Sequence, residues 1–138
     1  MFEKLLVAVD QSEHSDRAVD VACDLARLSG AEILVLHVKK VVLGFSGDLL
    51  EAEDESEIGV LLEKAANRFE EIGVPVSVQI RTAETGRIAH QIVVAATDFG
   101  ADAIVMGSRG RSAVSAFVLG SVAQGVLHLA KQRVLVVH

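Results

Sequence analysis

Hydrophobic residues along the chain form short, nearly continuous runs, separated by longer segments in which apolar positions recur every three or four residues. The runs cover Leu5–Val9, Ile33–Val38, Val74–Ile80, Ala103–Met106 and Val134–Val137. Apart from Val74–Ile80, which alternates, they are apolar nearly throughout. Because runs buried on both faces are typical of parallel sheets, these five segments predict the strands of a parallel sheet.

The segments between the runs predict four helices, each with an apolar stripe on one face. The stripes are Ala18, Val21, Ala22 and Leu25; Ile58, Leu61, Leu62, Ala65, Ala66 and Phe69; Ile88, Ile92, Ala95, Ala96 and Phe99; and Val122, Ala123, Val126, Leu127 and Ala130. The residues expected at helix ends are Ser15 and Gly30, Gly73 with Pro75, Gly100, and Ser121 as the cap of the last helix. This alternation predicts a doubly wound α/β sandwich with right-handed crossovers.

Length and composition favour one domain spanning residues 1–138. The chain has 138 residues, of which 51% are hydrophobic and one is proline, which suits a single compact core. No apolar run approaches the roughly 18 residues of a membrane helix, and no signal-peptide layout precedes Leu5, so we expect a soluble, cytoplasmic protein without membrane partners. The lone Cys23 excludes an internal disulfide and is expected to be a buried small hydrophobe.

The net charge of −6 comes from one block of the sequence. Six acids lie between residues 44 and 57, and the other 13 acids balance the 13 lysines and arginines. We interpret this block as a solvated, mobile connection and the polar start of a helix rather than as a docking site. Nucleic acid is a poor candidate partner, because the chain has no basic stripe and no Trp or Tyr.

In doubly wound sheets, ligands bind beyond the carboxyl ends of the strands, where the direction of winding reverses. The residues after the first four runs are Asp10-Gln11-Ser12, Lys39-Lys40, Arg81-Thr82 and Gly107-Ser108-Arg109-Gly110. If the first and fourth strands are neighbours, Asp10 faces the glycine-rich loop. Since a carboxylate beside phosphates suits Mg²⁺, Asp10 is the predicted metal ligand.

The segment from Gly107 to Gly110 predicts a phosphate-binding loop. Its glycines give access to backbone angles closed to other residues and let the chain approach phosphate oxygens. Arg109 and Arg111 supply positive charge. The alternative is that the two glycines only make a tight turn.

A second anion-binding position is predicted where Gly120 and Ser121 begin the last helix. The N–H groups of Ser121 and Val122, the Ser121 hydroxyl and the positive end of the helix dipole converge there, unless Ser121 serves only as a cap. Neither the Walker A string nor the Gly-x-Gly-x-x-Gly dinucleotide fingerprint occurs, which argues against those two classes of nucleotide-binding protein.

Other chemistries find little support. The five histidines, at positions 14, 37, 90, 128 and 138, show no short ligand spacing, so a zinc site is not expected, and His37 is interpreted as a sheet residue. Ser12 and Ser108 belong to turns without a recognisable base, which argues against a nucleophilic enzyme.

The spacing Gly107-x2-Gly110-x9-Gly120-Ser121 resembles the Gly-x2-Gly-x9-Gly-Ser/Thr signature of the universal stress protein family, in its ATP-binding branch. The similarity extends over nearly the whole chain and includes its strand segments. It implies the strand order 3-2-1-4-5, with ATP and Mg²⁺ across the ends of strands one and four. The sequence departs from the family pattern at Gln11, where glycine is common, which puts the adenosine side in doubt.

The resemblance also assigns site residues by motif position. Ala8 and Asp10 would lie along the nucleoside and the metal, and Val38 would contact adenine. The ribose and phosphates would be wrapped by Gly107, Ser108, Arg109, Gly110, Arg111 and Ser112, and the terminal phosphates held by Gly120, Ser121 and Val122.

The segment Arg133–Val137 would form an edge strand whose backbone groups are open to another chain. We therefore expect a homodimer through this C-terminal strand, as the resemblance also implies. The leading functional hypothesis is an ATP-binding stress-response or signalling module with an unidentified downstream protein partner. One alternative is a slow ATPase or autophosphorylating enzyme using the same pocket, and another is an interaction module without a ligand. Hydrolysis would be slow, because no residue is an obvious candidate to orient water.

Overall fold

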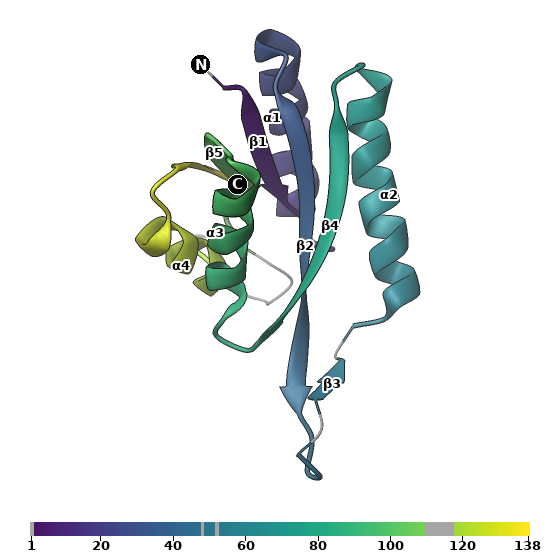
Figure 1. The fold of residues 1–138 in the computed structure, drawn as a ribbon, viewed down its shortest axis with the longest axis vertical. Coiled ribbons are helices and arrows are strands. Elements are labelled where there is room, and N and C mark those ends of the chain that lie inside the picture. Colours follow the sequence, from purple (N-terminus) through teal and green to yellow (C-terminus); the bar gives the residue numbers. More distant parts are fainter. Residues whose placement is uncertain (1, 48, 52, 110–117) are drawn as a thin grey trace.

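The protein is described here by a computed structural model that covers residues 2–47, 49–51, 53–109 and 118–138. Its elements are β1 (Lys4–Ala8), α1 (Glu13–Ser29), β2 (Glu32–Leu43), β3 (Leu49–Glu51), α2 (Glu55–Glu71), β4 (Val76–Glu84), α3 (Ile88–Phe99), β5 (Ala103–Gly107), α4 (Ser121–Leu129) and β6 (Arg133–Val137). The parallel strands lie in the order β4, β2, β1, β5, β6, as Figure 1 shows in part. Numbered among the parallel strands alone, this order is 3-2-1-4-5, and it confirms the predicted fold class.

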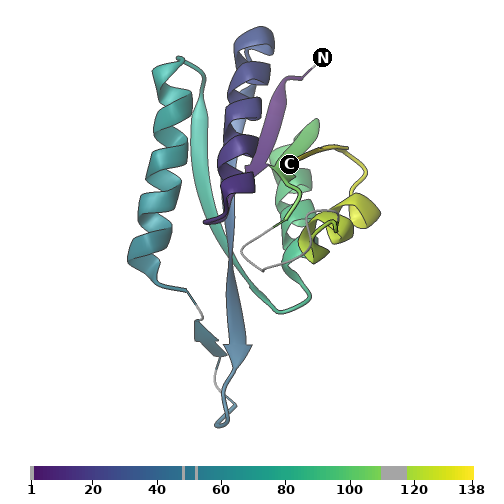
Figure 2. The ribbon, with the colours of Figure 1, turned by 180° about the vertical axis from the view of Figure 1, so that it is seen from behind.

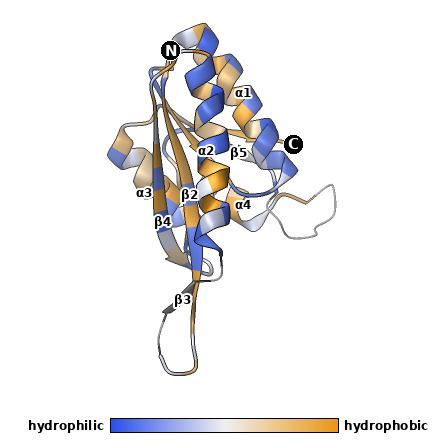
Figure 3. Ribbon diagram, turned by 90° about the vertical axis from the view of Figure 1, so that its right-hand side faces the viewer, coloured by the Kyte–Doolittle hydropathy of each residue, from blue (hydrophilic) through white to orange (hydrophobic). Residues whose placement is uncertain are grey.

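Both faces of the sheet are buried at its centre, which explains why the central strands are apolar at most of their positions. Leu5, Val7 and Val105 lie in one apolar cluster with residues of α1 and α2. Leu6 and Ile104, which alternate with them, lie in a second cluster with residues of α3 and α4. In the side view of Figure 3, α1 and α2 lie on one side of β2 and β4 and α3 on the other. Within the described ranges, no helix is both long and apolar enough to cross a membrane.

The helix ends differ from the sequence predictions at two positions. Ser12, rather than Ser15, caps α1, because the Ser12 hydroxyl accepts a hydrogen bond from the Ser15 N–H at 3.1 Å. At α4, Gly120 occupies the N-cap position and Ser121 is the first helical residue, without a side-chain cap. The expected C-terminal glycine after α1 is confirmed, since Gly30 adopts a left-handed conformation with φ of 72°.

Two strands are longer than the hydrophobic runs that predicted them. The pairing of β2 with β4 continues from Val38 opposite Arg81 to Val41 opposite Glu84. Lys39-Lys40 and Arg81-Thr82 were expected in loops, and this expectation is wrong because these residues continue the pairing of β2 with β4. Their charged side chains are tolerated there because Lys39 and Arg81 each have an acidic partner. The Lys39 ammonium lies 3.1 Å from a carboxylate oxygen of Glu55.

The acidic block between residues 44 and 57 is more structured than expected. Its residues 49–51 form β3, which pairs antiparallel with the end of β2 and builds an arm that extends beyond the other elements in Figures 1 and 2. Asp54 caps α2 by accepting from the Ser56 N–H at 2.8 Å. This cap, with Glu55 and Glu57 in the first turn, confirms the predicted polar start of a helix, and the Glu55 side chain is 77% exposed. The block departs from the expected mobile connection where residues 49–51 pair with β2.

Helices α3 and α4 approach each other closely at Gly125. A Cβ atom added there would lie 2.6 Å from the Cβ of Ala89, well inside van der Waals contact. In contrast, a Cβ added at Gly59 in α2 would meet no atom within 4 Å. Close packing therefore explains why residue 125 is glycine, whereas the surroundings of residue 59 leave room for a side chain.

We expect Gly125→Ala to lower the free energy of unfolding by about 1 kcal/mol, because an overpacking cost of about 1–3 kcal/mol exceeds a gain in helix propensity of about 1 kcal/mol. The matched substitution Gly59→Ala should raise it by about 0.5–1 kcal/mol, since only the propensity changes. Urea unfolding of both variants measures the difference. Equal stabilisation by the two substitutions would contradict the close contact.

Candidate functional site

The candidate site lies at the carboxyl edge of the sheet, where hydrogen bonds join three segments that are distant in sequence. The Ser12 hydroxyl, after β1, donates to the Arg109 carbonyl, after β5, at 3.4 Å. The Gly120 N–H, before α4, donates to the Ser108 carbonyl at 2.8 Å. The parallel pairing of β1 with β5 places their ends side by side. The structure therefore brings the predicted Asp10 turn, the start of the glycine loop and the start of α4 together.

Asp10 is held in a tight turn. Its Oδ1 accepts a hydrogen bond from the Ser12 N–H at 2.8 Å, and its own N–H donates to the Ser15 hydroxyl at 2.8 Å. The other carboxylate oxygen makes no hydrogen bond to the described residues. This oxygen of a half-buried side chain remains available to a ligand.

Gly107 ends β5, and the reason why this position requires glycine differs from the expected one. Its φ is not positive, so the predicted backbone freedom does not apply to this residue. A Cβ at Gly107 would lie 2.7 Å from the His14 Cβ and 2.9 Å from the His14 carbonyl carbon. Glycine is required here because β5 passes against the first turn of α1. Of the other predicted loop residues, Gly110, Arg111 and Ser112 lie outside the described residues.

Ser108 is a buried residue with an unusual feature. Its backbone is fixed, because its N–H donates to the Val137 carbonyl at 2.7 Å and its carbonyl accepts from Gly120. Only 2% of the residue is exposed, and its hydroxyl has no hydrogen-bond partner within the described part of the chain. Buried hydroxyls are nearly always paired, so this one indicates a missing partner.

The N-terminus of α4 lies next to Ser108. The first N–H groups of any helix lack partners inside the helix, and no side chain of the described residues caps α4. Its first residues, Ser121 and Val122, therefore present N–H groups and the positive end of the helix dipole. Such an end binds anions readily when the helix is long enough, and α4 has 9 residues.

Ala8 and Val38 form an apolar part of the same edge. Val38 is 8% exposed and lies in the cluster beneath α3 and α4, against which Ala8 and Val122 pack. The two predicted nucleoside contacts therefore lie on the face of the sheet that carries the start of α4. A groove of about 140 Å³ between α1 and α2 borders Val9 and Ser15, but it opens on the other face.

Arg109 is directed toward α1. Its guanidinium Nη2 lies 3.0 Å from Nε2 of His14, to which an N–H of the guanidinium can donate when the ring is neutral. The pKa of His14 is lowered, first by burial and then by the positive charges of Arg109 and Arg17, while Glu13 opposes the shift. In this structure, the Arg109 guanidinium that was expected to contact phosphates therefore contacts His14 of α1.

The metal-binding capacity of the edge is limited. No group of three or more His, Cys, Asp or Glu side chains that could hold a metal ion occurs among the described residues. Asp10 supplies one free carboxylate oxygen, whereas Mg²⁺ takes six oxygen ligands. A metal ion fits this site only if a bound ligand and water supply the other oxygens.

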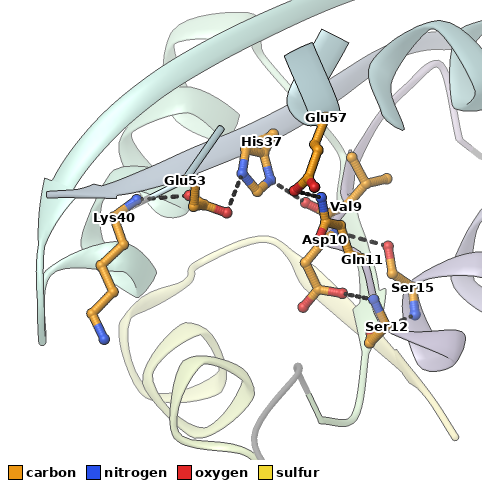
Figure 4. A network of polar contacts seen from close by, with 9 residues as sticks. All are labelled: Val9, Asp10, Gln11, Ser12, Ser15, His37, Lys40, Glu53 and Glu57. Carbon is orange, nitrogen blue, oxygen red and sulfur yellow. Dashed lines mark hydrogen bonds and ion pairs between the residues drawn. The ribbon is translucent and has the colours of Figure 1, made fainter. Parts of the chain in front are cut away.

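Sequence reasoning missed one part of this edge. His37 is confirmed as a sheet residue, but its ring lies between the Val9 carbonyl and the Glu53 carboxylate, as Figure 4 shows. Glu53 belongs to the acidic block that was interpreted as solvated. A histidine inside an apolar run, followed by a dense block of acids, was the available signal for such a pair.

Comparisons with known proteins agree over the whole chain. Residues 1–138 match the model of the universal stress protein family. Universal stress protein YxiE of Bacillus subtilis is 36% identical over 154 residues, with 99% of each chain covered. A universal stress protein structure from Archaeoglobus fulgidus in complex with dAMP has a TM-score of 0.74 and 26% identity, covering 99% of this chain and 98% of that one. A universal stress protein in complex with cAMP has a TM-score of 0.69 and 28% identity, with coverages of 99% and 97%.

Arg109→Met should raise the pKa of His14 toward its ordinary value of 6.5, because a neighbouring positive charge is removed. In the wild type, the folded pKa lies below the unfolded one. The neutral ring therefore contributes stability that is fully present above the pKa of His14 in the unfolded chain. This stability is lost as the pH falls through the lower pKa of His14 in the folded protein. NMR titration of the His14 ring measures the pKa. Arg27→Met, which removes an equal charge from the other end of α1, is the control, and equal shifts in both variants would contradict the assignment.

Proposed function

The chain belongs to the universal stress protein family, and we propose that it binds ATP with Mg²⁺ at the carboxyl edge of β1 and β5 and at the start of α4. In this proposal the protein is a cytoplasmic, single-domain module of a stress response. Bound nucleotide changes the surface that the module presents to a downstream protein.

The observation that carries the proposal is the buried Ser108 hydroxyl beside the uncapped start of α4. An unpaired buried hydroxyl costs about 1–3 kcal/mol, and a phosphate oxygen would remove this cost by accepting its hydrogen bond. The N–H groups of Ser121 and Val122 add donors and a favourable dipole at the same place. Together these groups favour an anion, and phosphate is the anion for which the Gly107-to-Ser121 spacing is typical.

The nucleoside side of the proposal is supported by the apolar edge. Ala8 and Val38 lie on the same face as α4, so a base resting on them places its phosphates toward the helix. The family members described in complex with dAMP and with cAMP are bound to adenine nucleotides, which supports adenine here. Gly107 lets the chain pass against α1 without a side chain between them. We assign Gly110, Arg111 and Ser112 to the phosphates on the motif alone, and Arg109 to the same ligand once it leaves His14.

Magnesium is assigned to Asp10 for two reasons. Its Oδ1 is occupied by the Ser12 N–H, which leaves the second oxygen as a ligand for a cation. The described residues hold no group of three or more potential metal ligands, which is consistent with Mg²⁺ that arrives bound to phosphates, because this ion keeps several waters and few protein ligands. The ion would neutralise repulsion between phosphates and the carboxylate of Asp10.

We also propose that two chains associate through β6. This strand pairs with β5 on one side, and it is the last strand of the sheet, so its other side presents backbone donors and acceptors. Leu135 on β6 is 40% exposed, which adds apolar surface at this edge. A second copy of β6 would cover both.

Calorimetric titration should show saturable ATP binding that Mg²⁺ strengthens, and Ser108→Ala should weaken it about five- to tenfold through loss of one hydrogen bond. The same variant should be as stable as the wild type or more stable by about 1 kcal/mol, because an unpaired hydroxyl is removed. The exposed Ser77→Ala is the matched control and should change neither property. No heat from the wild type at millimolar ATP, or a Ser108→Ala variant that loses stability but not affinity, would argue against the site.

Light scattering at tens of micromolar protein should give the mass of a dimer for the wild type and of a monomer for Leu135→Lys. A lysine on the exposed face of an edge strand opposes pairing of two sheets. Ile80→Lys places the same charge on the opposite edge strand, β4, where 48% of Ile80 is exposed, and should leave the dimer intact. A monomeric wild type would refute the interface.

A further inference from the structure

The peptide group between Val9 and Asp10 is held from both of its ends. The Val9 carbonyl accepts a hydrogen bond from Nδ1 of His37 at 2.7 Å, and the Asp10 N–H donates to the Ser15 hydroxyl at 2.8 Å (Figure 4). In a trans peptide, the C=O and N–H bonds point in opposite directions. Two hydrogen bonds on opposite sides therefore fix the plane of this peptide and the direction in which the Asp10 side chain leaves the backbone.

His37 is itself oriented by Glu53. The ring atom Nε2 lies 3.0 Å from Oε1 of Glu53, and the second carboxylate oxygen accepts from the Lys40 N–H at 2.9 Å. Both ring nitrogens thus face oxygen acceptors. Every contact is a good hydrogen bond when the ring carries a hydrogen on each nitrogen and Glu53 is ionised.

The pair is largely removed from solvent. The His37 side chain is 4% exposed and that of Glu53 is 19% exposed. Glu53 follows β3, so this contact ties the end of the arm to the carboxyl edge of β1. A continuous path of bonds runs from the Lys40 amide through Glu53 and His37 to the peptide that carries Asp10, as the dashed lines of Figure 4 show.

We propose that Glu53 and His37 are positioning residues for the nucleotide site: they hold the Val9–Asp10 peptide so that the free oxygen of Asp10 faces the ligand. This inference rests on the proposed function. The remaining bonds of the turn, from Ser12 and Ser15, hold Asp10 only from the α1 side. Because coupling is reciprocal, a ligand bound at Asp10 also stabilises the contacts of Glu53 with the arm.

The test compares Glu53→Ala with Glu53→Gln. Loss of the carboxylate should weaken Mg²⁺–ATP binding about tenfold, as is typical when a partner that orients a ligating group is removed. Glutamine should restore affinity to within about twofold, a difference under 0.5 kcal/mol on the scale of about 1.4 kcal/mol per tenfold, since its oxygen accepts from Lys40 and its amide donates to a neutral His37.

Glu55→Ala is the matched control. It removes the same charge two residues away, from a carboxylate that pairs with Lys39 and does not contact His37. Its affinity should match that of the wild type. Equal weakening in Glu53→Ala and Glu55→Ala would show a general effect of charge and would overturn the proposal.

Amide hydrogen exchange tests positioning in the absence of nucleotide. Exchange of the Asp10 amide should be faster in Glu53→Ala than in the wild type, and unchanged in Glu53→Gln and Glu55→Ala. An unchanged Asp10 amide in Glu53→Ala overturns the positioning role even if ATP binds. A wild type that does not bind ATP, together with the faster Asp10 exchange, overturns the proposed function and leaves the positioning role standing.

A measurement on the wild type alone covers the case in which Glu53→Ala does not fold. Saturating Mg²⁺–ATP should slow exchange of the Lys40 amide, which is bound to Glu53 and is not assigned to the ligand. Slower exchange supports the coupling, and no change at Lys40 overturns it.

Discussion

The parallel pairing of β1 with β2 on one side and β5 on the other is the constraint on which the rest of the structure depends. It places the carboxyl ends of the three strands at one edge of the sheet, so that the turn after β1 meets the segment after β5. The same pairing leaves β1 without an open edge, and the helices on both faces of the sheet bury Leu5, Leu6 and Val7 completely. An apolar central strand therefore has two roles: it holds the core together and it brings the polar turns into contact.

The polar groups at the carboxyl edge divide between the two faces of the sheet. Toward α3 and α4 lie Ala8 and Val38, together with the buried Ser108 hydroxyl and a free helix end that lack partners in the described chain. Toward α1 and α2 lie groups that are satisfied internally, among them His37 with Glu53 and Lys39 with Glu55. The face with polar groups that lack partners is suited to binding a ligand. The face whose polar groups are hydrogen-bonded is suited to holding the site in place.

Much of this could be predicted from the sequence, for reasons that particular residues make clear. The strands and helices follow from local periodicity, because burial on both faces or on one stripe leaves a direct pattern in the chain, whereas the strand order came from the family resemblance. Ser15 was mistaken for a cap because two serines near a helix start compete for the role, and only the bond from the Ser15 N–H to the Ser12 hydroxyl decides between them. Gly107 was explained by backbone freedom, whereas its contact with His14 joins positions that the sequence does not show to be neighbours. Glu53 was missed for the same reason, since its partner lies across the edge of the sheet.

Under the proposed function, the unpaired hydroxyl of Ser108 and the uncapped start of α4 would also affect how long the protein persists in a cell. A fold that leaves such groups unsatisfied is less stable alone than it is with a ligand, and a ligand at a hundred times its dissociation constant adds about 2.7 kcal/mol. Proteases act on the unfolded fraction, which a difference of this size changes about a hundredfold. Under the proposed function, a larger supply of ATP would therefore slow degradation of the protein and raise its abundance at a given rate of synthesis.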